Sequence, residues 1–144
     1  MLSFSAHCAS LGFPLKNVRW SWCAQSRDGS RVLFTIWHDE LAKDRFVLFP
    51  TSERRPGEIT LAANSTLGAR EIQHISKLAA NDSTVSAFGV ICIAHDPSAV
   101  PRRRKSYDPK TLRKLKVFQE GESFIACSVG EVTVADFLLE YRVL

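Results

Sequence analysis

An Asp-Gly pair, Asp28-Gly29, constrains the fold of this chain more than any other short feature of its sequence. It separates residues 18–25 from residues 31–38, and both runs are rich in β-branched and aromatic side chains. Glycine tolerates the positive φ that a tight turn requires, so this arrangement predicts a β-hairpin. The 144 residues are expected to form a single domain, residues 1–144, that is large enough for a hydrophobic core.

Four further strands are expected, at residues 45–49, 85–94, 115–118 and 123–129. Residues 85–94 are almost continuously apolar, which is typical of a strand buried on both faces. The last two strands flank Gly121 and predict a second hairpin. With about six strands in all, joined mainly by hairpins, the chain is expected to form a mostly antiparallel, barrel-like sheet.

Two helices are expected from their caps and their periodicity. Residues 3–11 begin at Ser3, a suitable N-cap, and end before a Gly and a Pro. Residues 67–80 place apolar side chains at helical spacing. The C-terminal tail allows two interpretations, because Thr133 can cap a helix over residues 135–141 and the same residues can also form a last strand. The chain is therefore predicted to be an α+β protein with two or three helices.

Residues 101–116 form a strongly basic segment, with eight Lys or Arg and one acidic residue, Asp108. The whole chain has 19 basic and 15 acidic residues, so the remainder holds 11 and 14 and is mildly acidic. Such a local excess indicates an anionic partner, with nucleic acid the first candidate. The alternative is a solvated loop that simply keeps the protein soluble. The expected phosphate contacts are Arg102, Arg103, Arg104, Lys105, Arg113 and Lys114.

Three tryptophans lie on the first predicted hairpin. Trp20 and Trp22 are two residues apart, so they share one face of a strand, and Trp37 lies on the partner strand. Such a set can form an aromatic wall, on which each stacked base contributes about 1–3 kcal/mol. The alternative is that the three indoles fill the core of a small barrel.

The sequence contains no recognisable catalytic constellation. It has no glycine-rich phosphate loop and no GxSxG motif, and its four cysteines and four histidines lack zinc-site spacing. His38, Asp39 and His74 are interpreted mainly as polar surface residues, and an enzyme that uses them is the least favoured alternative. We therefore expect no metal, no cofactor and no enzymatic activity. No apolar run reaches the ~20 residues that cross a bilayer, and the N-terminus is a poor secretory signal, so a cytoplasmic location without membrane contact is expected.

Three segments, in this order, resemble the non-catalytic domain that is joined to HNH-type nucleases in bacterial restriction-like proteins. They are GFPLKNVRWSWCAQSRDGSRVLFTIWHDEL, LGAREIQHISKLAA and GVICIAHDPSAVPRRRKSYD, and the resemblance covers roughly residues 12–120. It implies a domain that reads DNA, including modified DNA, with a barrel of the PUA or SRA type and an aromatic pocket for a flipped base. The matching positions are Trp20, Trp22, Trp37, Asp39, His74 and Arg102.

Two features depart from the pattern of that family. Ala69-Arg70-Glu71 stands where the family has Glu-Arg or a similar pair, so the role of that pair is not carried over. The chain also stops at Leu144 with no nuclease attached, and it is expected to be either a free-standing version or a fragment.

The leading hypothesis is a non-enzymatic nucleic-acid-binding module, with DNA favoured over RNA as its partner. The basic segment, as a loop, would contact phosphates, the tryptophans would contact bases, and Asp39 and His74 would supply hydrogen bonds. The alternative is a small ligand- or protein-binding domain, monomeric or homodimeric, whose C-terminal ADFLLEYRVL forms a sheet edge or a subunit contact. The sequence leaves open whether DNA or RNA is bound, whether a modified base is read, and the oligomeric state.

Overall fold

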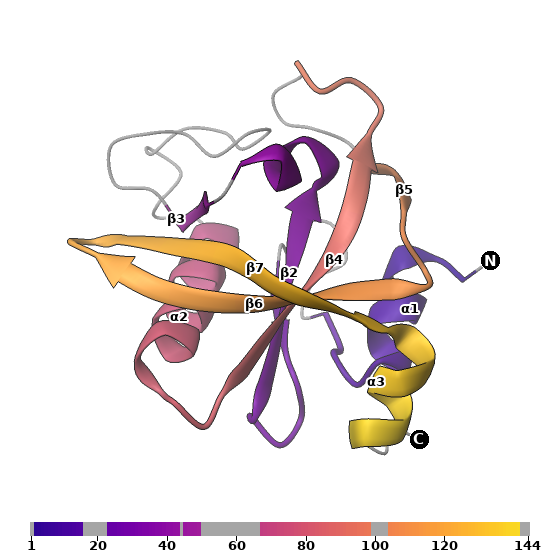
Figure 1. The fold of residues 1–144 in the computed structure, drawn as a ribbon, viewed down its shortest axis with the longest axis horizontal. Helices are drawn as coiled ribbons and strands as arrows, with labels where there is room; N and C mark the ends of the chain where they lie inside the picture. The colour runs from indigo at the N-terminus through magenta and orange to yellow at the C-terminus, as the bar shows by residue number, and fades with distance from the viewer. Residues whose placement is uncertain (1, 16–22, 44, 50–66, 99–103, 142–144) are drawn as a thin grey trace.

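A computed structural model describes residues 2–15, 23–43, 45–49, 67–98 and 104–141 of the chain (Figure 1). In chain order they contain α1 (Phe4–Ser10), β1 (Cys23–Gln25), β2 (Arg31–Trp37), the 3-10 helix η1 (His38–Ala42), β3 (Phe46–Phe49), α2 (Leu67–Asn81), β4 (Ser86–Ala94), β5 (Arg104–Tyr107), β6 (Thr111–Glu120), β7 (Ser123–Thr133) and α3 (Val134–Tyr141). The mixture of helices and strands confirms the predicted α+β class.

The hairpin predicted at Asp28-Gly29 joins β1 and β2. Gly29 has a φ of 77°, the left-handed conformation that the turn requires. The Asp28 carboxylate accepts a hydrogen bond from the backbone N–H of Ser30 and further bonds from the hydroxyls of Ser26 and Ser30. Because these bonds favour the charged form, they lower the pKa of Asp28. The turn is therefore fixed by its own side chains.

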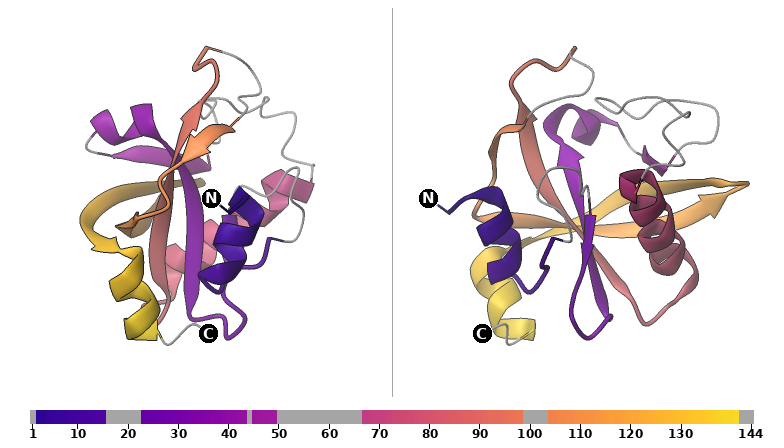
Figure 2. Two further views of the ribbon diagram at one scale, coloured as in Figure 1. Left: turned by 90° about the vertical axis from the view of Figure 1, so that its right-hand side faces the viewer. Right: turned by 180° about the vertical axis from the view of Figure 1, so that it is seen from behind.

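Among the described residues, seven strands form one sheet in the order β1-β2-β4-β6-β7-β3, and β5 also pairs with β4. Each pair is antiparallel except β2 with β4, which run parallel. The sheet curls strongly into a half-barrel (Figures 1 and 2). The mostly antiparallel, barrel-like sheet is thus confirmed, and the PUA or SRA type stays a prediction.

Both interpretations of the basic segment take it as a loop, but most of its described residues form strands. Its described residues 104–116 form β5 and the first part of β6, joined by a turn at Asp108. The Asp108 carboxylate accepts hydrogen bonds from the backbone N–H groups of Lys110 (2.8 Å) and Thr111 (3.3 Å). Both strands pair with β4, because the long β4 offers one edge to β5 at its end and to β6 near its beginning. A hydrogen-bonded sheet therefore carries the basic side chains.

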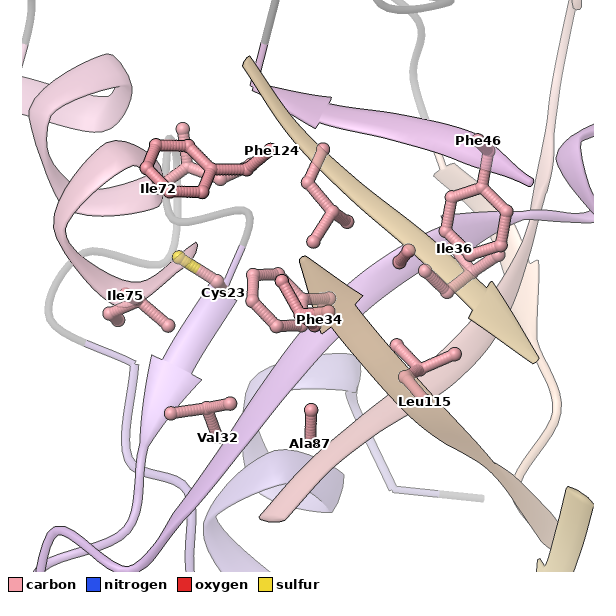
Figure 3. Close-up of a cluster of buried hydrophobic side chains, with 13 residues drawn as sticks. Cys23, Val32, Phe34, Ile36, Phe46, Ile72, Ile75, Ala87, Leu115 and Phe124 are labelled. Carbon is pink, nitrogen blue, oxygen red and sulfur yellow. The ribbon is translucent and has the colours of Figure 1, made fainter. Parts of the chain in front are cut away.

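The central strands β2 and β4 are buried on both faces, as predicted for β4. On one side of the sheet, Val32, Phe34 and Ile36 of β2 pack with residues of α2 (Figure 3). On the other side, Leu33 and Trp37 pack with residues of α1 and α3. Alternate side chains of one strand therefore serve two hydrophobic cores, one on each side of the sheet (Figure 2).

Two helices begin at the caps that the sequence predicts. The Ser3 side chain accepts a hydrogen bond from the backbone N–H of Ala6 at the start of α1 (3.2 Å). The Thr133 hydroxyl accepts one from the backbone N–H of Asp136 at the start of α3 (3.1 Å). The C-terminal tail is thus a helix over its described part, and the alternative of a last strand is wrong there.

Candidate nucleic-acid interface

The aromatic wall expected on the first hairpin is not formed by Trp37. This residue is 1% exposed and lies in the core between the sheet, α1 and α3. A ring buried in this way cannot stack on a base. The prediction that Trp37 contacts bases is therefore wrong, and Trp37 is a core residue. The cause is the position of β2, which lies between β1 and β4 with both of its faces covered. Trp20 and Trp22 lie outside the described residues.

The two predicted hydrogen-bonding residues lie on different elements. Asp39 is an exposed residue of η1, which follows β2, and His74 is an exposed residue of α2. Neither of them lines the cleft described below. Their exposure suits contact with a ligand, but neither of them belongs to the basic strands β5 and β6.

The described arginines of the predicted set make structural contacts. The guanidinium carbon of Arg104 lies 3.5 Å from the centroid of the Phe4 ring, a cation–π contact that joins β5 to α1. Arg113 lies 3.4 Å from the carboxylate of Glu131 on the neighbouring strand β7. Arg102 and Arg103 lie outside the described residues. A phosphate would have to compete with these contacts for Arg104 and Arg113.

The lysines of the segment remain available. Lys105, Lys110, Lys114 and Lys116 are exposed, and within the described part of the chain none of them forms an ion pair. The nearest acids along β6 and β7 are already engaged, since Glu131 pairs with Arg113 and Glu120 with Arg45. The positive charge of these lysines is therefore uncompensated by carboxylates of the described residues.

Two of these lysines form a pair on one face of β6, Lys114 and Lys116, which we call the lysine pair. Leu115 and Val117, which alternate with them, point into the core beneath α2. Residues two apart on a strand project in the same direction about 7 Å apart, a spacing comparable to that of successive phosphates along a nucleic-acid strand. Lys116 was not among the predicted contacts, although the alternation Lys-Leu-Lys-Val at residues 114–117 is a pattern by which it could have been found.

A cleft of about 520 Å³ opens beside the lysine pair. It lies where β6 leaves β4, since the two strands pair only from Gly89 opposite Arg113 to Ala87 opposite Leu115. Its lining comes from the end of α2, the start of β4, the middle of β6 and the end of α3: residues 79–83, 85–88, 114–117 and 141. The lysine pair thus belongs both to the exposed face of β6 and to the wall of a cleft.

The aromatic ring of Tyr141 is held in place at this cleft. The Arg31 guanidinium carbon lies 4.5 Å from the centroid of the Tyr141 ring. Phe88 meets the same ring edge-on, with centroids 5.7 Å apart. These contacts give the cleft a defined aromatic boundary.

Two of the buried ionisable groups, Cys8 and His7, lie on α1, away from the cleft. Burial raises the pKa of the Cys8 thiol to about 12, so it stays protonated at neutral pH. Burial also lowers the pKa of His7, and the Asp108 carboxylate opposes this shift. Within the described ranges, no group of three or more His, Cys, Asp or Glu side chains is placed to hold a metal ion. No helix of the described chain is long and apolar enough to span a membrane.

Comparison of the chain with protein-family models, curated proteins and solved structures finds no match. The resemblance to the domain joined to HNH-type nucleases therefore stays a prediction. The function has to be inferred from the arrangement of the residues themselves.

Proposed function

We propose that this protein is a non-enzymatic nucleic-acid-binding module that contacts the phosphate backbone through the lysine pair on β6. One observation carries the proposal: Lys114 and Lys116 project from one strand face, exposed and without an ion pair among the described residues. Ammonium groups at this spacing suit successive phosphates, and each neutralised phosphate releases counterions. Lys105 and Lys110 add two further exposed charges on the preceding strand and turn.

The same face of β6 continues into an aromatic residue. Phe118 lies two positions beyond Lys116 and is partly exposed, and the guanidinium carbon of Arg45 lies 5.2 Å from its ring centroid. A row of two lysines and a ring is typical of surfaces that follow a nucleic-acid strand, and a phosphate would compete with Glu120 for Arg45. Phosphate contacts supply affinity and orientation without sequence information, so the proposal favours binding with little dependence on sequence.

The test is the affinity for fluorescein-labelled single-stranded and duplex DNA, measured by fluorescence anisotropy at fixed low salt. The double variant Lys114→Gln/Lys116→Gln removes two charges from an exposed strand face and is expected to bind roughly tenfold or more weakly. The matched control is Lys43→Gln/Lys77→Gln, which removes one exposed lysine at the end of η1 and one on α2. It should keep the wild-type affinity. Equal affinities of the two double variants would refute the assignment.

A second candidate function, self-association, is favoured by two exposed apolar side chains. Val129 on β7 is 61% exposed and Leu139 on α3 is 77% exposed, and these elements follow each other in the chain. A second copy of this chain would cover them. Light scattering after size exclusion would then give a dimer mass that falls to the monomer mass in Leu139→Lys. A monomer mass for the wild-type chain would exclude this candidate.

A further inference from the structure

The two walls of the cleft between β4 and β6 have opposite chemistry. On the β6 side the lining includes Lys114 and Lys116, the lysine pair. On the other side stands the end of α2, with residues 79–81, Asp82 and Ser83. The last carbonyl groups of a helix carry partial negative charge and accept hydrogen bonds. The cleft therefore suits a ligand with an anionic group at one end and hydrogen-bond donors at the other.

Asp82 strengthens this polarity. One of its carboxylate oxygens accepts hydrogen bonds from the hydroxyl (2.6 Å) and the backbone N–H (2.9 Å) of Thr84. These bonds lower the pKa of Asp82, so the group stays anionic at neutral pH. An anionic carboxylate repels a phosphate from the α2 side of the cleft. The phosphate of a ligand is thereby directed to Lys114 and Lys116.

The size and the aromatic boundary of the cleft suit more than a phosphate ion. Its volume of about 520 Å³ lies within the range of about 300–1,000 Å³ that is typical of small-molecule sites. Tyr141, fixed by Arg31 and Phe88, is the aromatic residue at the boundary of this space. A bound inorganic phosphate would leave most of this volume to water. A phosphate joined to a sugar and a planar base would fill it.

From this arrangement we propose that the cleft binds a nucleoside monophosphate, with the phosphate on the lysine pair and the base against the end of α2. The inference rests on the proposed function, because it takes the lysine pair as a phosphate contact. The acceptors at the end of α2 favour a base with an exocyclic amino group. Cytosine presents such a donor at the position where uracil presents an acceptor. Cytidine monophosphate is therefore bound about fivefold more tightly than uridine monophosphate, as expected for one hydrogen bond.

The test is a titration of the full chain with cytidine monophosphate, uridine monophosphate and inorganic phosphate, in which the amide chemical shifts are measured at each ligand concentration. The expected result is saturable shifts at residues 79–88 and 114–117, with the cytidine nucleotide the tightest ligand. Lys114→Gln/Lys116→Gln should abolish saturation, and Lys43→Gln/Lys77→Gln should not. Ser83→Trp, in the exposed turn that lines the cleft, fills the space without a change of charge and should also abolish it.

Three results would overturn the inference. They are no saturable shift with either nucleotide, equal affinity for inorganic phosphate and cytidine monophosphate, and unchanged nucleotide binding in Ser83→Trp. Fluorescence anisotropy with the labelled oligonucleotide on the same samples separates the two proposals. If the protein binds the oligonucleotide but not the mononucleotides, the inference about the cleft is wrong and the proposed function stands.

A competition between cytidine monophosphate and the labelled oligonucleotide distinguishes two sources of the nucleotide, a bound strand and a free mononucleotide. Displacement of the labelled oligonucleotide by cytidine monophosphate would assign the cleft to a nucleotide of the bound strand. Saturable binding of the mononucleotide without displacement would assign it to a free nucleotide. Either outcome supports the binding of a nucleotide in the cleft, and the absence of mononucleotide binding refutes it.

Discussion

His7 is an ionisable side chain in the core, 4% exposed, with its ring centroid 4.7 Å from that of Tyr107. Among the described residues its Nε2 atom has no hydrogen-bond partner. Burial without a partner disfavours the charged imidazolium, and this lowers the pKa of His7 although Asp108 acts in the opposite direction. The folded chain therefore holds His7 neutral at a pH where the unfolded chain begins to protonate it.

The stability of the fold is predicted to fall as this histidine titrates. Below the ordinary histidine pKa the unfolded chain binds more protons than the folded chain, so the free energy of unfolding decreases as the pH is lowered. His7→Phe keeps an aromatic ring at the site and removes the titration. Chemical denaturation at about pH 7 and about pH 5 should show a smaller loss for His7→Phe than for the wild-type chain. Identical losses would mean that His7 is already charged or accessible in the folded state.

Single residues also mark the limit of sequence-based inference at the site. Ser3, Gly29 and Thr133 could be assigned from the sequence because caps and turns depend on near neighbours. Trp37 could not be assigned, since a strand residue is a surface or a core residue according to what packs on its face. Lys116 could have been found, because its alternation with Leu115 and Val117 is a local pattern.

At the scale of elements, the packing of β4 against its neighbours depends on Gly89. A Cβ added to Gly89 would lie 2.6 Å from Cγ1 of Ile36 on β2 and 3.3 Å from Cδ1 of Leu115 on β6. Gly89→Ala is therefore expected to destabilise the fold by about 1–3 kcal/mol, the cost of an overpacked core. Gly130→Ala on β7 is the control, since its Cβ would meet its nearest neighbour, Lys114, at 3.8 Å. Denaturant unfolding of both variants tests this, and equal stabilities would contradict the close approach.

The strands themselves were largely predictable, but their partners were not. The two hairpins, the buried β4 and the helix α2 follow from turn residues, caps and periodicity, which are local signals. The assignment of residues 104–107 to β5 depends on their pairing with the edge of β4, which their own polar and basic composition does not indicate. The parallel pairing of β2 with β4 also depends on the whole sheet, since β3 and α2 separate the two strands in the chain.

At the scale of the whole molecule, the curled sheet places the lysine pair of β6 beside the cleft. β6 pairs with β4 over a short stretch and then continues with β7 alone, so it carries the lysine pair past the end of α2. The sequence predicts the charge of this segment but not the cleft beside it, because the point at which β6 leaves β4 is set by long-range pairing. The central claim is that this arrangement presents uncompensated positive charge to a phosphate backbone.

The salt dependence of nucleic-acid binding tests that claim most directly. The logarithm of the association constant for duplex DNA should fall linearly with the logarithm of the salt concentration, and the slope counts the phosphates that are neutralised. Lys114→Gln/Lys116→Gln should reduce the magnitude of this slope by about 2, since each phosphate that a lysine no longer neutralises lowers it by about 0.9, while Lys43→Gln/Lys77→Gln leaves it unchanged. A wild-type slope near zero, or the same slope in all three proteins, would contradict the account.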